Sequence, residues 1–282
     1  MVDYLDELEG KSIFALREAR RSYKKIGVLC SMGKDSLTVL WLIRKAFFGE
    51  VPFKVIHIDT GFKFPEIYEF RDRLVKEWGL DLVVARNDEA LKKGISPDKV
   101  AKFLCCSELK TNALKQLLKK EKFDALILGI RRDEHGIRSK ERYFSPRDKD
   151  FKWNVSKESN AGDSGFEALQ DSEMSGWSIF GTEFKDADHV RIHPILHWGE
   201  KEIWEYVLRE KIPVVGLYFS KGGKRYRSIG CAPCCKPVDS NASTVEEIVK
   251  ELGETSVRER SGRSQDKENE FTMQKLRSLG YM

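Results

Sequence analysis

The feature that most constrains this chain is a stretch near its start, in which an apolar run, a short loop and a helical pattern follow one another. The apolar run IGVLCS spans 26–31, the loop SMGKDS spans 31–36, and LTVLWLIRKAF (37–47) has the length and apolar face of a helix. A short apolar run bounded by a turn is typical of a buried parallel strand. When a strand enters a helix through a tight loop, backbone N–H groups and the positive end of the helix dipole point at one place. The stretch therefore predicts an anion site.

The same alternation of strand and helix continues along the chain. Further strands are expected at 53–59, 80–86, 123–130 and 189–196. Further helices are expected at 3–24, 65–79, 107–122 and 200–211, and the third of these opens with Ser107 as an N-cap. This order predicts an α/β fold, with a parallel sheet and helices on both faces.

The domain organisation follows from where this pattern stops. Residues 1–198 are expected to form the nucleotide-binding domain, and 199–282 a helical extension that contains cysteines, with helices near 244–252 and 271–279. The polar segment 144–188 contains scattered Ser, Gly and Asp, so it predicts a long surface loop.

Charge and hydropathy limit the compartment and the partners. No apolar run approaches the roughly 18 residues that span a bilayer. The first residues are acidic and lack the apolar core of a secretory signal, so a cytoplasmic protein without membrane contact is expected. The net charge of +5, from 50 basic and 45 acidic side chains, fits a polyanionic substrate such as a nucleotide, but it does not establish nucleic-acid binding.

The loop itself contains the residue types that bind phosphate. Gly33 allows close approach of the backbone, Ser31 and Ser36 have hydroxyl groups, and Lys34 carries charge. It is not a Walker loop, because that motif begins with glycine, where this chain has Val28, and continues Gly-Lys with Ser or Thr rather than an aspartate. A plain glycine turn capped by Asp or Ser is the structural alternative.

The string resembles the S-x-G-x-D-S loop of the PP-loop ATP pyrophosphatases, which cleave ATP between its α and β phosphates. The resemblance implies that the loop holds pyrophosphate and that Asp35 positions Mg²⁺ or holds the loop. Over nearly the full length, the chain resembles sulfate adenylyltransferase subunit 2, of the phosphoadenylyl-sulfate reductase family. The segments that carry this resemblance are 45–74, 129–148, 189–207 and 257–268. The residues that it assigns to ATP or pyrophosphate in the loop are Ser31, Met32, Gly33, Lys34, Asp35 and Ser36.

Two further motifs end strands at the same edge of the predicted sheet, where ligands of open α/β sheets bind. Asp59, Thr60 and Gly61 end the second strand, and Gly129 ends the fourth. The resemblance implies that these four residues contact the nucleotide. Arg131 and Arg132 follow Gly129 and are expected to act in catalysis with Lys34 and Asp35, by neutralising phosphate or sulfate charge. The basic stretch continues with Arg138, Lys140 and Arg142, of which Arg138 in particular is expected to be solvated.

Five of the six cysteines fall in two clusters. One is Cys105-Cys106, and the other is Cys231-Ala-Pro-Cys234-Cys235. In a reducing compartment such grouping favours metal or redox chemistry over disulfides. A structural zinc site and unligated thiols both remain open, although adjacent cysteines fit zinc spacing poorly. The sixth, Cys30, is expected to be a buried strand residue.

The two clusters resemble the CC…CxxC pattern of adenylyl-sulfate reductases, which binds a [4Fe–4S] cluster. The resemblance implies Cys105, Cys106, Cys231 and Cys234 as ligands, with Cys235 as a spare or working thiol. Reductases of this type also carry a nucleophilic cysteine near the C-terminus. This chain has no cysteine after Cys235, so that route of reduction is not expected.

Together these features predict an enzyme that cleaves ATP to pyrophosphate and an adenylylated intermediate for iron–sulfur-dependent sulfur incorporation. The resemblance to the ATP-pyrophosphatase proteins of DNA phosphorothioation implies ATP, Mg²⁺ and a [4Fe–4S] cluster as cofactors. The implied partners are a cysteine desulfurase, DNA-modification proteins, DNA and a second copy of the chain. The alternative is the small subunit of sulfate adenylyltransferase with a GTPase partner subunit. A non-catalytic regulator that binds nucleotide and cluster is a third reading, which the intact loop disfavours.

Three other groups have weaker signals. His193 and His197 are four residues apart, but on a strand this spacing does not secure a shared metal-binding face. Trp153 and Trp177 in the polar segment are candidates for partner contact. A basic run contacts phosphate or nucleic acid, or is simply solvated, and its members are Lys221, Lys224, Arg225 and Arg227.

Overall fold

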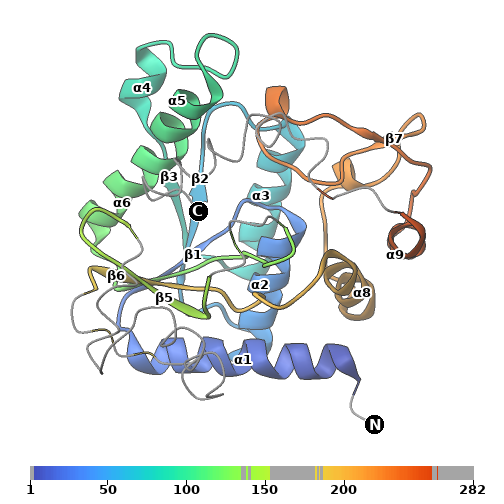
Figure 1. Cartoon of the computed structure of the whole chain (residues 1–282), viewed down its shortest axis with the longest axis horizontal. Coiled ribbons are helices and arrows are strands. Elements are labelled where there is room, and N and C mark those ends of the chain that lie inside the picture. Colours follow the sequence, from blue (N-terminus) through green and yellow to red (C-terminus); the bar gives the residue numbers. More distant parts are fainter. Residues whose placement is uncertain are drawn as a thin grey trace, which may run out of the picture.

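The chain folds around a twisted six-stranded sheet with helices on both faces (Figure 1). The computed structural model describes residues 3–134, 138, 141–152, 182, 184, 187–255 and 259. The strands are β1 (Ile26–Leu29), β2 (Lys54–Ile58), β3 (Leu82–Ala85), β4 (Ala125–Ile127), β5 (Phe144–Arg147) and β6 (His189–Ile192). The long helices are α1 (Tyr4–Ser22), α2 (Lys34–Ala46), α3 (Pro65–Trp78), α6 (Ala113–Glu121), α8 (Glu200–Glu210) and α9 (Val245–Glu254). The predicted α/β fold is confirmed.

The sheet order is β3-β2-β1-β4-β6-β5, and the first five of these strands are parallel. The chain builds outward from β1 through β2 to β3, and then returns to add β4 on the other side of β1. The order of strands therefore reverses between β1 and β4. In open sheets of this kind, the crevice at such a switch point is where ligands bind.

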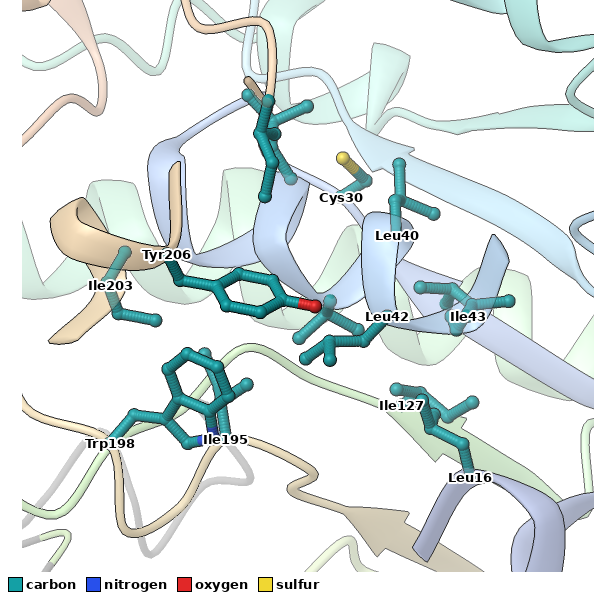
Figure 2. Close-up of a cluster of buried hydrophobic side chains, with 14 of the residues drawn as sticks. Leu16, Cys30, Leu40, Leu42, Ile43, Ile127, Ile195, Trp198, Ile203 and Tyr206 are labelled. Atoms are coloured by element: carbon teal, nitrogen blue, oxygen red, sulfur yellow. The ribbon is translucent and has the colours of Figure 1, made fainter. Parts of the chain in front are cut away.

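Neighbouring residues of each strand point to opposite faces of the sheet, and this divides the core in two. Val28 belongs to the large core under α1, α2, α3 and α8, whereas Leu29 belongs to the smaller core under α6. Figure 2 shows part of the large core, where the ring of Tyr206 in α8 extends toward Leu42 of α2. Because α8 shares this core, the extension after 198 packs directly on the helix that follows the loop.

Two expectations about the sheet need correction. The sheet is mixed rather than fully parallel, because β5 pairs antiparallel with β6. This edge strand lies inside the segment 144–188, which was expected to be loop throughout. Its sequence FSPR contains proline, and a proline in a short polar run hides the strand signal. The described residues of the rest of that segment lie outside any named helix or strand.

The cysteine-bearing helix also begins earlier than expected. The helical stretch opens with α5 (Lys102–Cys106), passes through a π-helical turn at Ser107–Asn112 and continues as α6. Ser107 is therefore inside the helical stretch and is not its N-cap. A short helix that was not predicted, α4 (Asp88–Lys92), lies beside it. Within the described residues, no helix has both the length and the apolar character needed to cross a bilayer.

Candidate active site

The loop between β1 and α2 is a tightly closed turn. Ser36 Oγ donates to the carbonyl of Gly33 at 2.9 Å, and Ser31 Oγ lies 3.4 Å from Ser36 Oγ. Met32 adopts the left-handed conformation with a φ of 63°, which few non-glycine residues do, and its side chain is fully buried. The core therefore anchors the middle of the loop, and the two serines face each other across it.

A pocket opens beside this loop at the switch point of the sheet. Its polar and charged lining comes from the loop, the segment after β2, the π-helical turn, the segment after β4, the short 3₁₀ helix Gly216–Tyr218 and the loop 228–230. The polar lining residues are Ser31, Lys34, Asp35, Ser36, Lys63, Lys110, Glu134, Arg138, Tyr218 and Ser228, and glycines at 33, 129 and 230 complete the backbone wall. The predicted loop residues thus line one pocket together with Gly129, whereas Met32 is buried behind them.

Gly129 brings the end of β4 against the first turn of α2. A Cβ on this residue would lie 3.1 Å from the carbonyl carbon and oxygen of Asp35 and from the amide nitrogen of Ser36. These contacts are with backbone, which cannot rotate away. A Cβ here would push the first turn of α2 by a few tenths of an ångström, so the role of Gly129 is to allow this close approach.

Tyr218, in the short 3₁₀ helix Gly216–Tyr218, caps the start of α2. Its phenol oxygen accepts a hydrogen bond from the backbone N–H of Lys34 at 2.9 Å. A Cβ on Gly33 would lie 3.4 Å from the same phenol oxygen. A side chain from the C-terminal part therefore shapes the phosphate loop, and no local sequence signal announces it.

Behind the loop lies a closed ring of four alternating charges. Asp35 pairs with Lys34 through one carboxylate oxygen, at 2.9 Å, and with Arg131 through the other. Glu259 likewise pairs with Lys34 through one oxygen and with Arg131 through the other. The side chains of Lys34 and Arg131 are only 1% and 0% exposed. The positive charges of Lys34 and Arg131 therefore interact mainly with the carboxylates of Asp35 and Glu259.

The ring fixes the ionisation of its members. Burial alone would lower the pKa of Lys34 and Arg131, but the carboxylates of Asp35 and Glu259 outweigh it and raise both. Burial would raise the pKa of Glu259, but the two cations lower it to about 2. All three side chains are charged at neutral pH.

Arg132 points away from this pocket. Its guanidinium lies 3.0 Å from His197 Nε2 and donates to the carbonyl of Glu141 at 2.9 Å. His193 instead has its Nδ1 2.8 Å from the carbonyl of Arg142. The structure thus brings Arg131 to the loop but not Arg132, and His193 and His197 have separate partners.

Asp59, Thr60 and Gly61 form the turn after β2, and the side chain of Asp59 serves the turn itself. Asp59 accepts from Tyr68 at 2.7 Å, from the amide of Gly61 at 2.8 Å and from Arg86 at 2.9 Å. Burial would raise the pKa of Asp59, and these hydrogen bonds and the Arg86 charge lower it below its usual value. Asp59 therefore stays ionised and shapes the pocket edge from outside the lining.

The four predicted ligand cysteines converge next to this turn. All six cysteines lie in the described ranges, and each is buried and outside any disulfide. Thr60 Oγ1 lies 3.2 Å from Cys231 Sγ, and the backbone of Cys231 forms an isolated antiparallel bridge with Lys63 of the pocket wall. Burial, followed by the charges of Cys106, Cys231 and Cys234, raises the pKa of Cys105 to about 12, and Lys110 opposes this.

The remaining thiols stand apart from this group. Cys235 Sγ accepts a hydrogen bond from the backbone N–H of Gly230 at 3.1 Å, and Cys30 is buried in the core at the end of β1 (Figure 2). Among the described residues, no three His, Cys, Asp or Glu side chains are yet arranged to hold a metal ion. The four thiols are therefore neighbours without a closed coordination site.

The other predicted basic residues have varied surroundings. Arg225 and Arg227 are buried and pair with Glu251 and Glu200, each at 2.7 Å, whereas Lys221 and Lys224 are exposed. Arg138 was expected to be solvated, but its side chain is only 14% exposed, lines the pocket and pairs with Glu134. Lys140, Trp153, Trp177 and the helix expected near 271–279 lie outside the described residues.

The fold and the loop together define a class of protein. A mostly parallel sheet with a closed serine-containing loop at its switch point is the architecture of an α/β nucleotide-binding protein. The fold matches a phosphoadenylyl-sulfate reductase from Candida auris with a TM-score of 0.51 and 17% identity, covering 82% of this chain and 98% of that one. It also matches an FMN adenylyltransferase from Candida glabrata with a TM-score of 0.55 and 16% identity, covering 85% and 68%.

Sequence comparison places the chain within this class. Residues 25–237 match the phosphoadenosine phosphosulfate reductase domain, and the chain belongs to that family. Sulfate adenylyltransferase subunit 2 of Geotalea uraniireducens is 36% identical over 99% of this chain and 98% of its own length. The subunit of the same name from Pseudomonas paraeruginosa is 36% identical over the whole of both chains. The predicted full-length resemblance is confirmed, and so is the expectation of an enzyme of the ATP-dependent adenylyltransferase class.

Proposed function

We propose that this enzyme cleaves ATP to pyrophosphate and an adenylylated intermediate, and that it does so in the service of iron–sulfur-dependent sulfur incorporation. The observation that carries the proposal is the contact between the nucleotide pocket and the cysteine group. Lys63 and Lys110 line the pocket, and both also lie beside the thiols, Lys63 through its bridge to Cys231 and Lys110 through its charge. Simple adenylation needs no group of thiols beside the residues that line the pocket.

In the adenylation step, an oxygen of the acceptor attacks the α-phosphorus of ATP. The bond from the α-phosphorus to the bridging oxygen breaks, and that oxygen leaves with the electron pair as part of pyrophosphate. The loop around Ser31 and Ser36 receives the pyrophosphate through hydroxyl and backbone N–H groups. The ammonium groups of Lys63 and Lys110 supply positive charge on the opposite wall.

For Mg²⁺, the pocket offers few uncommitted carboxylates. Both oxygens of Asp35 pair with cations, which favours its role in holding the loop over direct coordination. Glu134 lines the pocket but pairs with Arg138. We therefore assign Mg²⁺ chiefly to the phosphate oxygens of bound ATP, with Asp35 and Glu134 as neighbours that complement its charge.

The donor chemistry of the cysteine group fits an iron–sulfur cluster. Four soft thiol donors, two from each of two segments, lie close together, and burial followed by the charges of neighbouring thiols raises the pKa of Cys105 and Cys234. Such repulsion is relieved when bound iron neutralises the thiolates. Cys105, Cys106, Cys231 and Cys234 would hold the [4Fe–4S] cluster. When bound, the cluster would supply a site for binding or activating sulfur next to the adenylylated group.

The proposed acceptor is an oxygen that sulfur then replaces, and the phosphate backbone of DNA is the candidate of this class. This proposal calls for a cysteine desulfurase as sulfur donor and for DNA-modification proteins as partners in the cytoplasm. A net charge of +5 is compatible with a polyanionic substrate.

A second candidate function is the small subunit of sulfate adenylyltransferase, which makes adenylyl sulfate with a GTPase partner subunit. The full-length identity of 36% with subunits of that name favours it. In this case sulfate is the acceptor, and the thiols only brace the pocket wall.

Pyrophosphate release decides between the two functions. Release should be measured with ATP and Mg²⁺, with and without sulfate, and with and without a GTPase subunit. Pyrophosphate release that depends weakly on sulfate supports sulfur incorporation. Release that depends strongly on sulfate and on the GTPase subunit refutes sulfur incorporation and supports the second candidate.

Iron and acid-labile sulfide analysis tests the cluster independently. Anaerobically prepared protein should contain about four of each per chain. Cys106→Ser should lose most of the iron, whereas the matched control Cys235→Ser should retain it, because Cys235 lies outside the group of four. Four thiols loaded with zinc and no sulfide would refute the cluster.

A further inference from the structure

The ring of alternating charges behind the phosphate loop joins residues from distant parts of the chain. Lys34 and Asp35 begin α2, Arg131 follows β4, and Glu259 comes from the C-terminal segment. The side-chain carboxylate of Glu259 closes the ring. One of its oxygens pairs with Lys34 and the other with Arg131, and the same two cations pair with the two oxygens of Asp35. No other described carboxylate contacts both Lys34 and Arg131 except Asp35 itself.

The surroundings of the ring make Glu259 more than an incidental contact. The side chain of Glu259 is 7% exposed, and the cations that it pairs with are almost completely buried. A buried charge without a partner is costly, and it moves toward any opposite charge within reach. Without Glu259, Lys34 would keep only Asp35 as a paired carboxylate and Arg131 would keep Asp35 and Asp133, so Asp35 would be drawn from its present position between the two cations.

The ring is connected to the pocket through Asp35 and through Arg131. The backbone of Asp35 and Ser36 touches Gly129, and both residues line the pocket. Arg131 also bonds Asp133 at 3.0 Å, whose other oxygen accepts from the first amide of α8, Glu200, at 2.9 Å. A shift of Asp35 or Arg131 would therefore displace the loop and the first turn of α8.

We infer that Glu259 is a positioning residue of the nucleotide site, which sets the place of the phosphate loop by clamping Lys34 and Arg131 against Asp35. This inference rests on the proposed function, because it takes the loop as the binding site of the ATP phosphates. Glu259 is thus a working part of the site, although it does not line the pocket. Glu259 acts through the ring and has no contact with the nucleotide.

This role is distinct from two others that the same contacts allow. If Glu259 were an internal competitor of the nucleotide, its removal would free Lys34 and strengthen ATP binding. If it were only a brace of the fold, its removal would lower stability and leave the affinity of the folded protein for ATP unchanged.

The test compares Glu259→Gln with Glu251→Gln. Glu251 pairs with the buried Arg225 at 2.7 Å, outside the pocket lining, so it controls for the loss of a buried ion pair as such. The dissociation constant of a non-hydrolysable ATP analogue with Mg²⁺, the KM for ATP in pyrophosphate release and the Tm are measured for each. We expect at least a tenfold rise in the dissociation constant and KM for E259Q. For E251Q we expect a lower Tm with less than a twofold change in either constant.

The conservative variant Glu259→Asp keeps the test decisive if E259Q does not fold. Its charge is retained, but its shorter side chain can reach Lys34 or Arg131 and not both, so an intermediate rise in KM of several-fold is expected. Unchanged or tighter ATP binding in the folded Glu259 variants overturns the inference. Absence of ATP binding in the unmodified chain overturns the proposed function, and the inference with it, whereas binding that is normal in both variants overturns the inference alone.

Discussion

Gly129→Ala tests whether the nucleotide site depends on the close approach of β4 to the loop. The added methyl would lie 3.1 Å from three backbone atoms of Asp35 and Ser36. Ordinary contacts of this kind are about 3.4 Å or longer, so the first turn of α2 must move by a few tenths of an ångström. The φ of Gly129 is not positive, so contact is the only source of strain.

The size of the effect follows from this displacement. Overpacking by one methyl costs about 1–3 kcal/mol of folding free energy. Misplacing a reacting group by about 1 Å costs roughly 100-fold in rate, so a shift of about 0.3 Å predicts a roughly fourfold lower kcat/KM for ATP. This equals about 0.8 kcal/mol of transition-state stabilisation.

The assay is pyrophosphate release at varied ATP, together with thermal unfolding. Gly253→Ala is the matched control, because a Cβ there meets nothing within 4 Å and Gly253 lies inside α9. It should leave kcat/KM unchanged and stabilise the chain by about 0.5–1 kcal/mol. A folded Gly129→Ala enzyme with normal kcat/KM would refute the assignment of the nucleotide to this loop.

Two further predictions concern the cap and the ring. Tyr218→Phe removes the acceptor for the Lys34 N–H, so it should cost about 1 kcal/mol in urea unfolding and raise the KM for ATP; unchanged values of both would contradict the cap. The pKa of Glu259 falls from its usual 4.5 to about 2 on folding, so its stabilisation is present above pH 4.5 and lost as the pH falls toward 2. This amounts to at most about 3 kcal/mol. Burial also lowers the pKa of His57 and His193 to about 4, and this destabilises the chain below pH 6.5 in all variants. Unfolding free energies at pH 6, 4 and 3 should therefore fall less steeply in E259Q than in the unmodified chain, and parallel curves would contradict the charged ring.

The sequence predicted the phosphate loop because its signal is local. A buried strand, a glycine-containing loop and a helix start within a dozen residues, and the residues that the loop needs are adjacent. The position of Gly129 beside this loop could also be predicted, because the carboxyl ends of parallel strands lie at the same edge of the sheet. The convergence of the cysteine pairs was predicted only through the resemblance, because no spacing rule brings Cys106 and Cys231 together.

The parts that were missed depend on contacts between distant segments. The ring joins Lys34 to Glu259, 225 residues apart, and a glutamate in a polar segment has no periodicity that marks it as buried. The sequence around Tyr218 likewise indicates only an apolar residue of the extension, and nothing in it predicts that the phenol oxygen accepts a hydrogen bond from the loop. Arg132 has the same local signal as Arg131, but the next residue along an extended chain points the other way, and so only Arg131 reaches the ring.

The pocket and the thiol group share structural elements, and this has a consequence for how they work. Cys231 rests on Thr60 and bridges Lys63, while Cys105 and Cys106 precede the π-helical turn that carries Lys110. Both lysines line the pocket, so a nucleotide that draws their ammonium groups toward its phosphates changes the field at the thiols. Lys110 counteracts the raised pKa of Cys105, and its movement toward ATP would favour the neutral thiol over the thiolate. We therefore expect the state of the cysteine group to depend on whether the pocket is occupied, and such a dependence would support the proposed link between adenylation and sulfur chemistry.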